Sequence, residues 1–160
     1  MSQDQTVIPA PAAAPPGELA LVVRRTIRAT PQRVFAAWTR PEQLRRWWGP
    51  AEVRCPAAEV DLRLGGRYRI TNEFPDGRQV FIAGEFQVIE PPHRLVYTWG
   101  IEPAAPDSER VTVRFEARPG ATEVIVVHER IASPAARVLH EQGWLGCLAG
   151  LAEFLDEPGS

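Results

Sequence analysis

Two histidines are the side chains best suited to chemistry in this chain. His128 lies in the alternating apolar segment 122–130, and His140 lies further on in a helical pattern. If the two rings face one another, they could act as a general base and as a hydrogen-bond donor to a carbonyl group. Glu129 and Arg25 are the charged residues expected beside them. The alternative is that each histidine is a structural residue with satisfied hydrogen bonds, so no catalytic residue is assigned.

Several kinds of chemistry are not expected. Two histidines without a third ligand at a fixed spacing are a weak metal signal, so we expect no metal. No phosphate-binding glycine loop, dinucleotide fingerprint or nucleophile elbow occurs, and we expect no cofactor. All 18 basic residues are arginine, which excludes a Schiff-base lysine. Cys55 and Cys147 lack metal-type spacing and are interpreted as small buried residues.

The charge and hydropathy of the chain limit which partners and which cellular compartment are expected. The formal net charge is -2, and the arginines are spread over different elements, so we expect no nucleic-acid partner. No segment approaches the ~20 apolar residues of a membrane span, so no membrane association is expected. The N-terminus has no basic segment followed by an apolar one, and a cytoplasmic protein is expected.

The last long segment predicts one helix from Ser133 to about Leu155. Ser133 is a suitable N-cap, and Pro134 lies where a missing N–H costs nothing. Apolar and aromatic positions recur every three or four residues and form one stripe. The stripe contains His140, Trp144, Cys147, Leu148, Leu151 and Leu155.

The segment from Glu18 predicts a strand, followed by two short helices. Leu21, Val23, Arg25 and Ile27 share one face of that strand. If this face is buried, Arg25 lies at the edge of the core and needs a carboxylate, a ligand or water; otherwise it extends into solvent at the sheet edge.

The helical segments that follow begin at recognisable caps. Thr30 and Pro31 are typical of the start of a helix, and Thr39 with Glu42 has the spacing of a capping box for a second one. The Trp47–Trp48 pair ends this region. We expect one indole to pack inward and the other to line an opening, although both could belong to the core.

After residue 52 the periodicity changes to two, which predicts antiparallel strands. The expected strands are 53–64, 67–74, 79–90, 93–99, 110–117 and 122–130, with a loop at 102–108. Segment 53–64 is either one strand or an irregular pair of strands. Strands in a run with segregated helices indicate the α+β class. We therefore predict one domain over residues 18–156, with a curved antiparallel sheet of about seven strands wrapped on the long C-terminal helix. Residues 1–17 are rich in Pro and Ala and are interpreted as a flexible tail.

A curved sheet wrapped on one helix leaves a cavity wherever the two do not interdigitate. Aromatic residues on the strands and on the helix would form its walls, and Arg25 and the two histidines would provide its polar groups. The expected ligand-binding residues are Arg25, Trp48, Tyr68, Phe86, Tyr97, Trp99, His128, His140 and Trp144.

Several segments together carry a family resemblance. They are FAAWTRPEQLRRWWGP, EVDLRLGGRYR, GEFQVIEPPHRLVYTW, VTVRF and VVHERIASPAARVLHEQGWLGCLAGLAEFL. The chain resembles the heat-shock-protein-90 ATPase activator homologue family, a branch of the START/SRPBCC (Bet v 1-like, polyketide cyclase-like) superfamily. The resemblance covers about residues 19–155 and implies the helix-grip fold.

Three functions remain open at this point. The first is a small-molecule-binding protein that holds an apolar or aromatic ligand between sheet and helix. The second is a cyclase, dehydratase or hydrolase that uses His128 or His140 for proton transfer. The third is a co-chaperone-like interaction module that uses an exposed Trp47 or Trp48. A homodimer is also open, because Ile125 and Val127 break the alternation of their strand.

Overall fold

The computed structural model describes residues 18–49, 52–103 and 105–156, so the predicted tail over 1–17 lies outside the described residues. One antiparallel sheet of seven strands forms the body of the molecule, in the order β2-β8-β7-β6-β5-β4-β3. Its strands are β2 (Leu19–Ile27), β3 (Arg54–Val60), β4 (Arg67–Glu73), β5 (Gln79–Glu90), β6 (Arg94–Glu102), β7 (Ala105–Arg118) and β8 (Ala121–Ile131). The α+β class and the sheet of about seven strands are confirmed.

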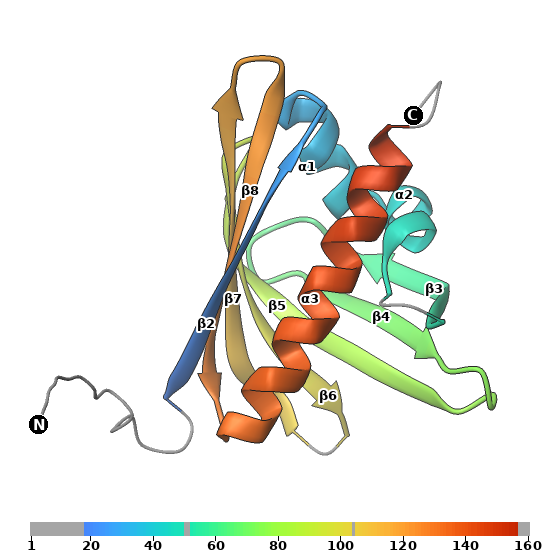
Figure 1. Ribbon diagram of the computed structural model, residues 1–160. Coiled ribbons are helices and arrows are strands. Elements are labelled where there is room, and N and C mark those ends of the chain that lie inside the picture. Colours follow the sequence, from blue (N-terminus) through green and yellow to red (C-terminus); the bar gives the residue numbers. More distant parts are fainter. Residues whose placement is uncertain (1–17, 50–51, 104, 157–160) are drawn as a thin grey trace, which may run out of the picture.

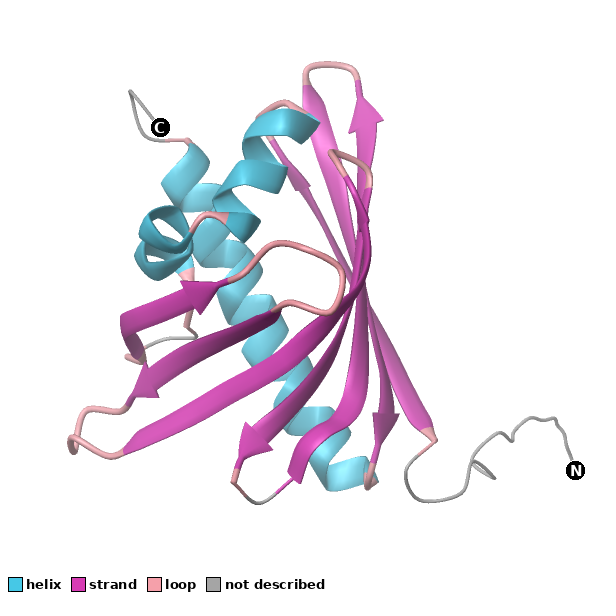
Figure 2. Cartoon of the chain, turned by 180° about the vertical axis from the view of Figure 1, so that it is seen from behind, coloured by secondary structure: helices cyan, strands magenta, loops and turns pink. Residues whose placement is uncertain are grey.

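The long C-terminal helix, α3 (Pro134–Leu155), crosses one face of the sheet (Figure 1). As predicted, the Ser133 hydroxyl accepts a hydrogen bond from the Ala136 N–H, and proline occupies the first turn. The predicted stripe from Trp144 to Leu155 is buried, because these residues meet the sheet on one side and the short helices on another. Figure 2 shows all the helices on the same side of the curved sheet.

The two short helices are α1 (Pro31–Thr39) and α2 (Pro41–Trp47), and they lie beside the C-terminal half of α3 (Figure 1). Thr30 caps α1 as expected, by accepting a hydrogen bond from the Arg33 N–H. The predicted capping box is wrong. Thr39 is still part of α1, and its hydroxyl donates back to the Phe35 carbonyl. Pro41 fixes the start of α2 instead, because its missing N–H is tolerated in the first helical turn.

The predicted loop over 102–108 is also wrong, because β7 already begins at Ala105 and pairs there with Ile101. The prolines and Asp107 are typical of a loop, but here they form an irregular strand end. Asp107 has a φ of 56°, and the β6–β7 register shifts between Trp99 and Ile101. The longer strand places Glu109 within the sheet, next to residues of the candidate site.

Candidate functional site

A cavity of about 410 Å³ lies between the sheet and the N-terminal half of α3. Two glycines on α3 show why the space is there. A Cβ on Gly150 would lie 2.6 Å from the Trp47 carbonyl oxygen, whereas a Cβ on Gly143 would meet nothing within 4 Å. The C-terminal half of the helix is therefore closely packed against α2, and the half around Gly143 faces open space. The cavity is lined by Trp48, Asn72, Phe74, Arg78, Val80, Ile82, Trp99, Ile101, His128, Leu139, His140, Gly143, Trp144 and Cys147.

His128 lies on β8, with its side chain fully buried beneath α3. Its Nδ1 accepts a hydrogen bond of 3.0 Å from the indole N–H of Trp144, and its Nε2 lies 2.6 Å from Oε1 of Glu109. An indole nitrogen can only donate, so Nδ1 must carry the lone pair. In the neutral ring the proton is therefore on Nε2, and it is donated to Glu109. The contacts of this residue determine its tautomer.

Burial and hydrogen bonding act on His128 in opposite directions. Burial lowers the pKa of the ring below its ordinary value of 6.5, the hydrogen bond to Glu109 raises it, and the net shift is downward. A second proton would also have to enter at Nδ1, where the Trp144 N–H already points. His128 is therefore a neutral hydrogen-bond donor at neutral pH.

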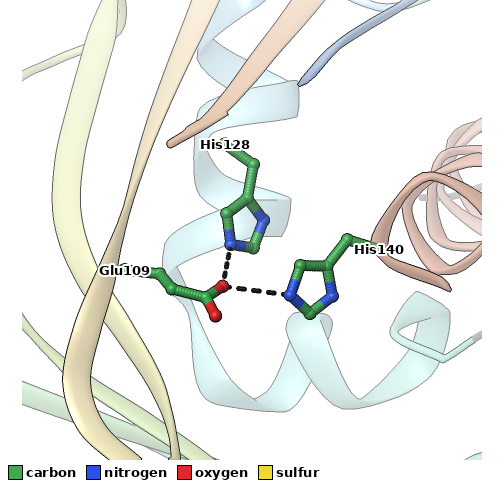
Figure 3. A group of neighbouring side chains, drawn as sticks. All are labelled: Glu109, His128 and His140. Carbon is green, nitrogen blue, oxygen red and sulfur yellow. Dashed lines mark hydrogen bonds and ion pairs between the residues drawn. The ribbon is translucent and has the colours of Figure 1, made fainter. Parts of the chain in front are cut away.

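Glu109 comes from β7 and shares its inward face with Val111 and Val113, as the alternation of the strand requires. Its carboxylate lies beside the two imidazole rings and approaches Nε2 of each (Figure 3). Burial alone would raise the pKa of this carboxyl, but the contacts with His128 and His140 outweigh burial and lower it from 4.5 to about 2. Glu109 is thus an ionised acceptor in a largely enclosed site.

His140 reaches the same carboxylate from α3 (Figure 3). Its Nε2 lies 3.0 Å from Oε1 of Glu109, close enough for an ion pair, but outside hydrogen-bond geometry. The His140 ring stacks on His128, with 4.6 Å between centroids and 11° between planes. The expectation that the two histidines approach one another is confirmed. Trp99 completes the group by placing its ring edge-on to both imidazoles at 4.9 Å.

Glu109, His128 and His140 have ligand atoms within 4.8 Å of one another, the right donor types for a transition metal. The tautomer of His128 does not fit this use. A metal at Nε2 would displace its proton, and a metal-bound histidine normally donates through the other nitrogen to an acceptor. Here Trp144 presents a donor to that nitrogen instead. We therefore interpret the three residues as a polar cluster in which His128 donates to Glu109 and His140 lies within ion-pair distance of the same carboxylate.

Five of the nine predicted ligand-binding residues line the cavity: Trp48, Trp99, His128, His140 and Trp144. Both members of the Trp47–Trp48 pair belong to the buried core, and Trp48 also lines the cavity. Trp47 packs inward and donates to the Ala37 carbonyl, while Trp48 lines the cavity and donates to Oδ1 of Asn72. Both indoles are buried, so neither offers the exposed surface that the interaction-module hypothesis needed.

The structure places the other predicted residues elsewhere. Tyr68, Phe86 and Tyr97 pack around a separate space of about 20 Å³, which holds no more than a water molecule. The Tyr68 hydroxyl donates to the Thr98 carbonyl, and the Tyr97 hydroxyl accepts from the Trp38 indole, so both are satisfied within the core. Arg25 is exposed on β2, at the sheet edge, and lines none of these cavities.

Glu109 was not among the predicted site residues, and the charged residue expected beside the histidines was Glu129 instead. Glu129 points to the other face of the sheet and forms a salt bridge of 2.5 Å with Arg110. Asn72 and Arg78 were missed as well. A usable signal was present, because Glu109, Val111, Val113 and Phe115 alternate along one face. The assignment of 102–108 to a loop obscured it.

Most of the chain matches a known protein family. The family model described as Activator of Hsp90 ATPase homolog 1-like protein matches residues 28–156, from α1 to the end of α3. No curated protein matches the sequence significantly. Among the described residues, no helix has the length and hydropathy needed to cross a membrane.

Solved structures with a similar fold are found over nearly their whole length. A protein from Chromobacterium violaceum is 24% identical with a TM-score of 0.78, and the match covers 86% of this chain and 97% of that chain. The AHSA1-like protein from Aeromonas hydrophila is 24% identical with a TM-score of 0.75, covering 86% and 92%. The AHSA1 protein from Silicibacter pomeroyi is 26% identical with a TM-score of 0.76, covering 86% and 98%. The predicted helix-grip fold and the family resemblance are confirmed.

Proposed function

Because the chain belongs to the family of Activator of Hsp90 ATPase homolog 1-like proteins, we propose that it is a cytoplasmic small-molecule-binding protein that holds an apolar or aromatic ligand between the sheet and α3. The observation that carries this proposal is the cavity of about 410 Å³ beside α3, a size typical of ligand sites. Close-packed protein interiors leave few voids larger than a water molecule, so a space of this size beside α3 is room that a ligand can occupy.

The walls of the cavity suit an aromatic or alkyl group. Trp48 and Trp144 meet edge to face at 5.5 Å and form one corner, and Trp99 lies beside the histidines. Leu139 and Ile101 line the cavity while remaining exposed, which indicates that the cavity opens to solvent between them. A ligand would enter past these side chains, and its apolar part would leave water and contact the indole rings.

Replacing Gly143 with leucine is expected to weaken ligand binding strongly without unfolding the protein. The new side chain enters open space on a helix, where leucine also has the higher helix propensity, so the melting temperature should stay equal or rise. Binding of 2-naphthaleneethanol, measured by calorimetry, should weaken at least about tenfold. A ligand retained from expression, seen as excess mass under native but not denaturing conditions, should also disappear.

Gly143→Ala is the matched control, because it makes the same backbone change and adds only one methyl group. It should retain binding. Equal binding by the Gly143→Leu protein would show that ligands do not occupy this cavity and would refute the proposal.

A second candidate function is proton transfer by His140, as in a cyclase, dehydratase or hydrolase. The observation that favours it is the ionised Glu109 beside a histidine that lines the cavity, since a carboxylate can orient an imidazole base and stabilise its protonated form. Glu109 and His128 would then act as positioning residues.

Exchange of the α-protons of 2-tetralone in deuterated water, followed by NMR, tests this second function. The protein should accelerate exchange, and His140→Gln should reduce the rate by about 100-fold. Glu141→Gln, which changes an exposed neighbour on α3, is the control. An unchanged rate in His140→Gln would eliminate proton transfer at this residue.

A homodimer through the outer face of the sheet stays a prediction. Ile125 and Val127 are half-buried there, on the side of β8 that faces away from α3.

A further inference from the structure

One charged residue distinguishes the wall of the cavity. Among the lining residues, Arg78 is the only aspartate, glutamate or arginine, and it comes from the hairpin between β4 and β5. Asn72 pairs with Val80 in this hairpin, and the Phe74 N–H donates to the Arg78 carbonyl. These four residues therefore share the face of the hairpin that looks into the cavity, as the alternation of paired strands requires.

Arg78 is exposed on the hairpin, and its guanidinium has no ionic partner among the described residues. It lies over the Phe74 ring, 4.3 Å from the centroid, and no carboxylate of the described residues lies within salt-bridge distance. The nearby Asp76 uses a carboxylate oxygen to accept from the backbone N–H of Arg78. Contact with the ring restricts the side chain, so less entropy is lost when an anion binds.

Arg69 provides the contrast on a neighbouring part of the sheet. Its guanidinium lies over the Phe81 ring at a similar distance, 4.1 Å, but it is paired with Glu102 at 3.1 Å and does not line this cavity. The charge of Arg69 is thus neutralised by Glu102, whereas the charge of Arg78 remains positive at the cavity wall.

A second donor stands on the same face. The Asn72 carbonyl oxygen accepts from the Trp48 indole at 2.9 Å, which fixes the orientation of the amide. Its amino group then has two N–H donors and no acceptor among the described residues. Arg78 lies two residues from Val80, the cross-strand partner of Asn72. This diagonal separation is roughly 7–8 Å, within reach of an arginine side chain.

We propose that the ligand is an amphipathic carboxylic acid, whose aromatic or alkyl part packs against Trp48, Trp99 and Trp144 and whose carboxylate binds Arg78 and the amide of Asn72. This inference rests on the proposed binding function and specifies its ligand class. Glu109 determines which end of the cavity the ligand carboxylate occupies. Its own ionised carboxylate beside the histidines repels a second anion, so the ligand carboxylate favours the hairpin end.

The test compares 2-naphthaleneacetic acid with 2-naphthaleneethanol, which share the ring system and differ in charge. Calorimetry at low ionic strength should show the acid binding to the wild-type protein roughly tenfold more tightly than the alcohol. Arg78→Gln should remove this preference by weakening the acid alone. Arg69→Gln should leave both affinities within about twofold, because that charge lies outside the cavity.

The outcomes separate the two proposals. Equal affinities of acid and alcohol, or an acid preference that survives in Arg78→Gln, would overturn the anionic ligand class and leave the binding function intact. Failure of both compounds to bind would count against the binding function itself. Retention of the acid preference in Arg78→Lys would support a role for the positive charge.

Discussion

Replacing Glu109 with alanine is expected to lower the free energy of unfolding by about 2–3 kcal/mol at pH 7. The substitution removes the acceptor of the fully buried His128 N–H and the only carboxylate oxygen within reach of His140 Nε2 among the described residues. A buried donor without a partner costs more than an average hydrogen bond contributes. Urea unfolding at constant ionic strength measures the change.

The difference in unfolding free energy between wild type and Glu109→Ala depends on pH through the carboxyl group of Glu109. The pKa of Glu109 is about 2 in the folded protein and 4.5 as the ordinary value. A lowered folded-state pKa stabilises the protein above pH 4.5, and this stabilisation is lost as the pH falls from 4.5 toward 2. The difference between wild type and Glu109→Ala should therefore shrink across that interval.

Two further variants make the result specific. Glu109→Gln keeps an acceptor oxygen for His128 and should lose less stability than Glu109→Ala. Glu116→Ala, on the same strand but away from the cavity, should change the unfolding free energy by no more than about 0.5 kcal/mol. Equal stability of Glu109→Ala and wild type at pH 7 would contradict the polar cluster.

The second large effect is expected from Trp144→Phe, which removes the N–H that holds the tautomer of His128. The unfolding free energy should fall by about 1–3 kcal/mol, since a buried hydrogen bond is lost and a smaller ring fills the space. With Nδ1 free, His128 can exchange tautomers or accept a proton, and its pKa should rise.

Nitrogen-15 NMR of the histidine rings reads this change directly. In the wild type, the lowered pKa keeps His128 neutral, with the proton on Nε2, while the unfolded chain takes up a proton below about pH 6.5. The stability that comes from keeping His128 neutral in the folded protein is therefore lost as the pH falls below 6.5. In Trp144→Phe, the ring should titrate closer to its ordinary value and the acid sensitivity should decrease.

Trp48→Phe is the matched control, because Trp48 lines the same cavity and also loses one indole hydrogen bond, to Asn72. It should leave the titration of His128 unchanged. A His128 ring that keeps its tautomer and its pKa in Trp144→Phe would show that the indole does not control it.

The amino-acid sequence by itself determined the elements and their inward faces. Ser133 and Pro134 start α3 because cap chemistry is local, and its stripe is buried because the 3.6-residue period puts those side chains on one side. The alternation of β8 likewise placed His128 inward. Since both histidines face the interior, their approach followed from patterns readable along the chain.

Only the tertiary structure decided which other groups meet the two histidines and the cavity. Glu109 reaches His128 because the β7–β8 register pairs Val111 with His128, and that register depends on contacts distant in sequence. Arg25 is solvent-exposed although Val23 and Ile27 on the same face of β2 are buried, a difference that the alternation of the strand does not reveal. Tyr68, Phe86 and Tyr97 fill the core because neighbouring strands bring their rings together. Periodicity fixes the face on which a side chain lies, but register and packing fix its neighbours, and the chemistry of this site depends on those neighbours.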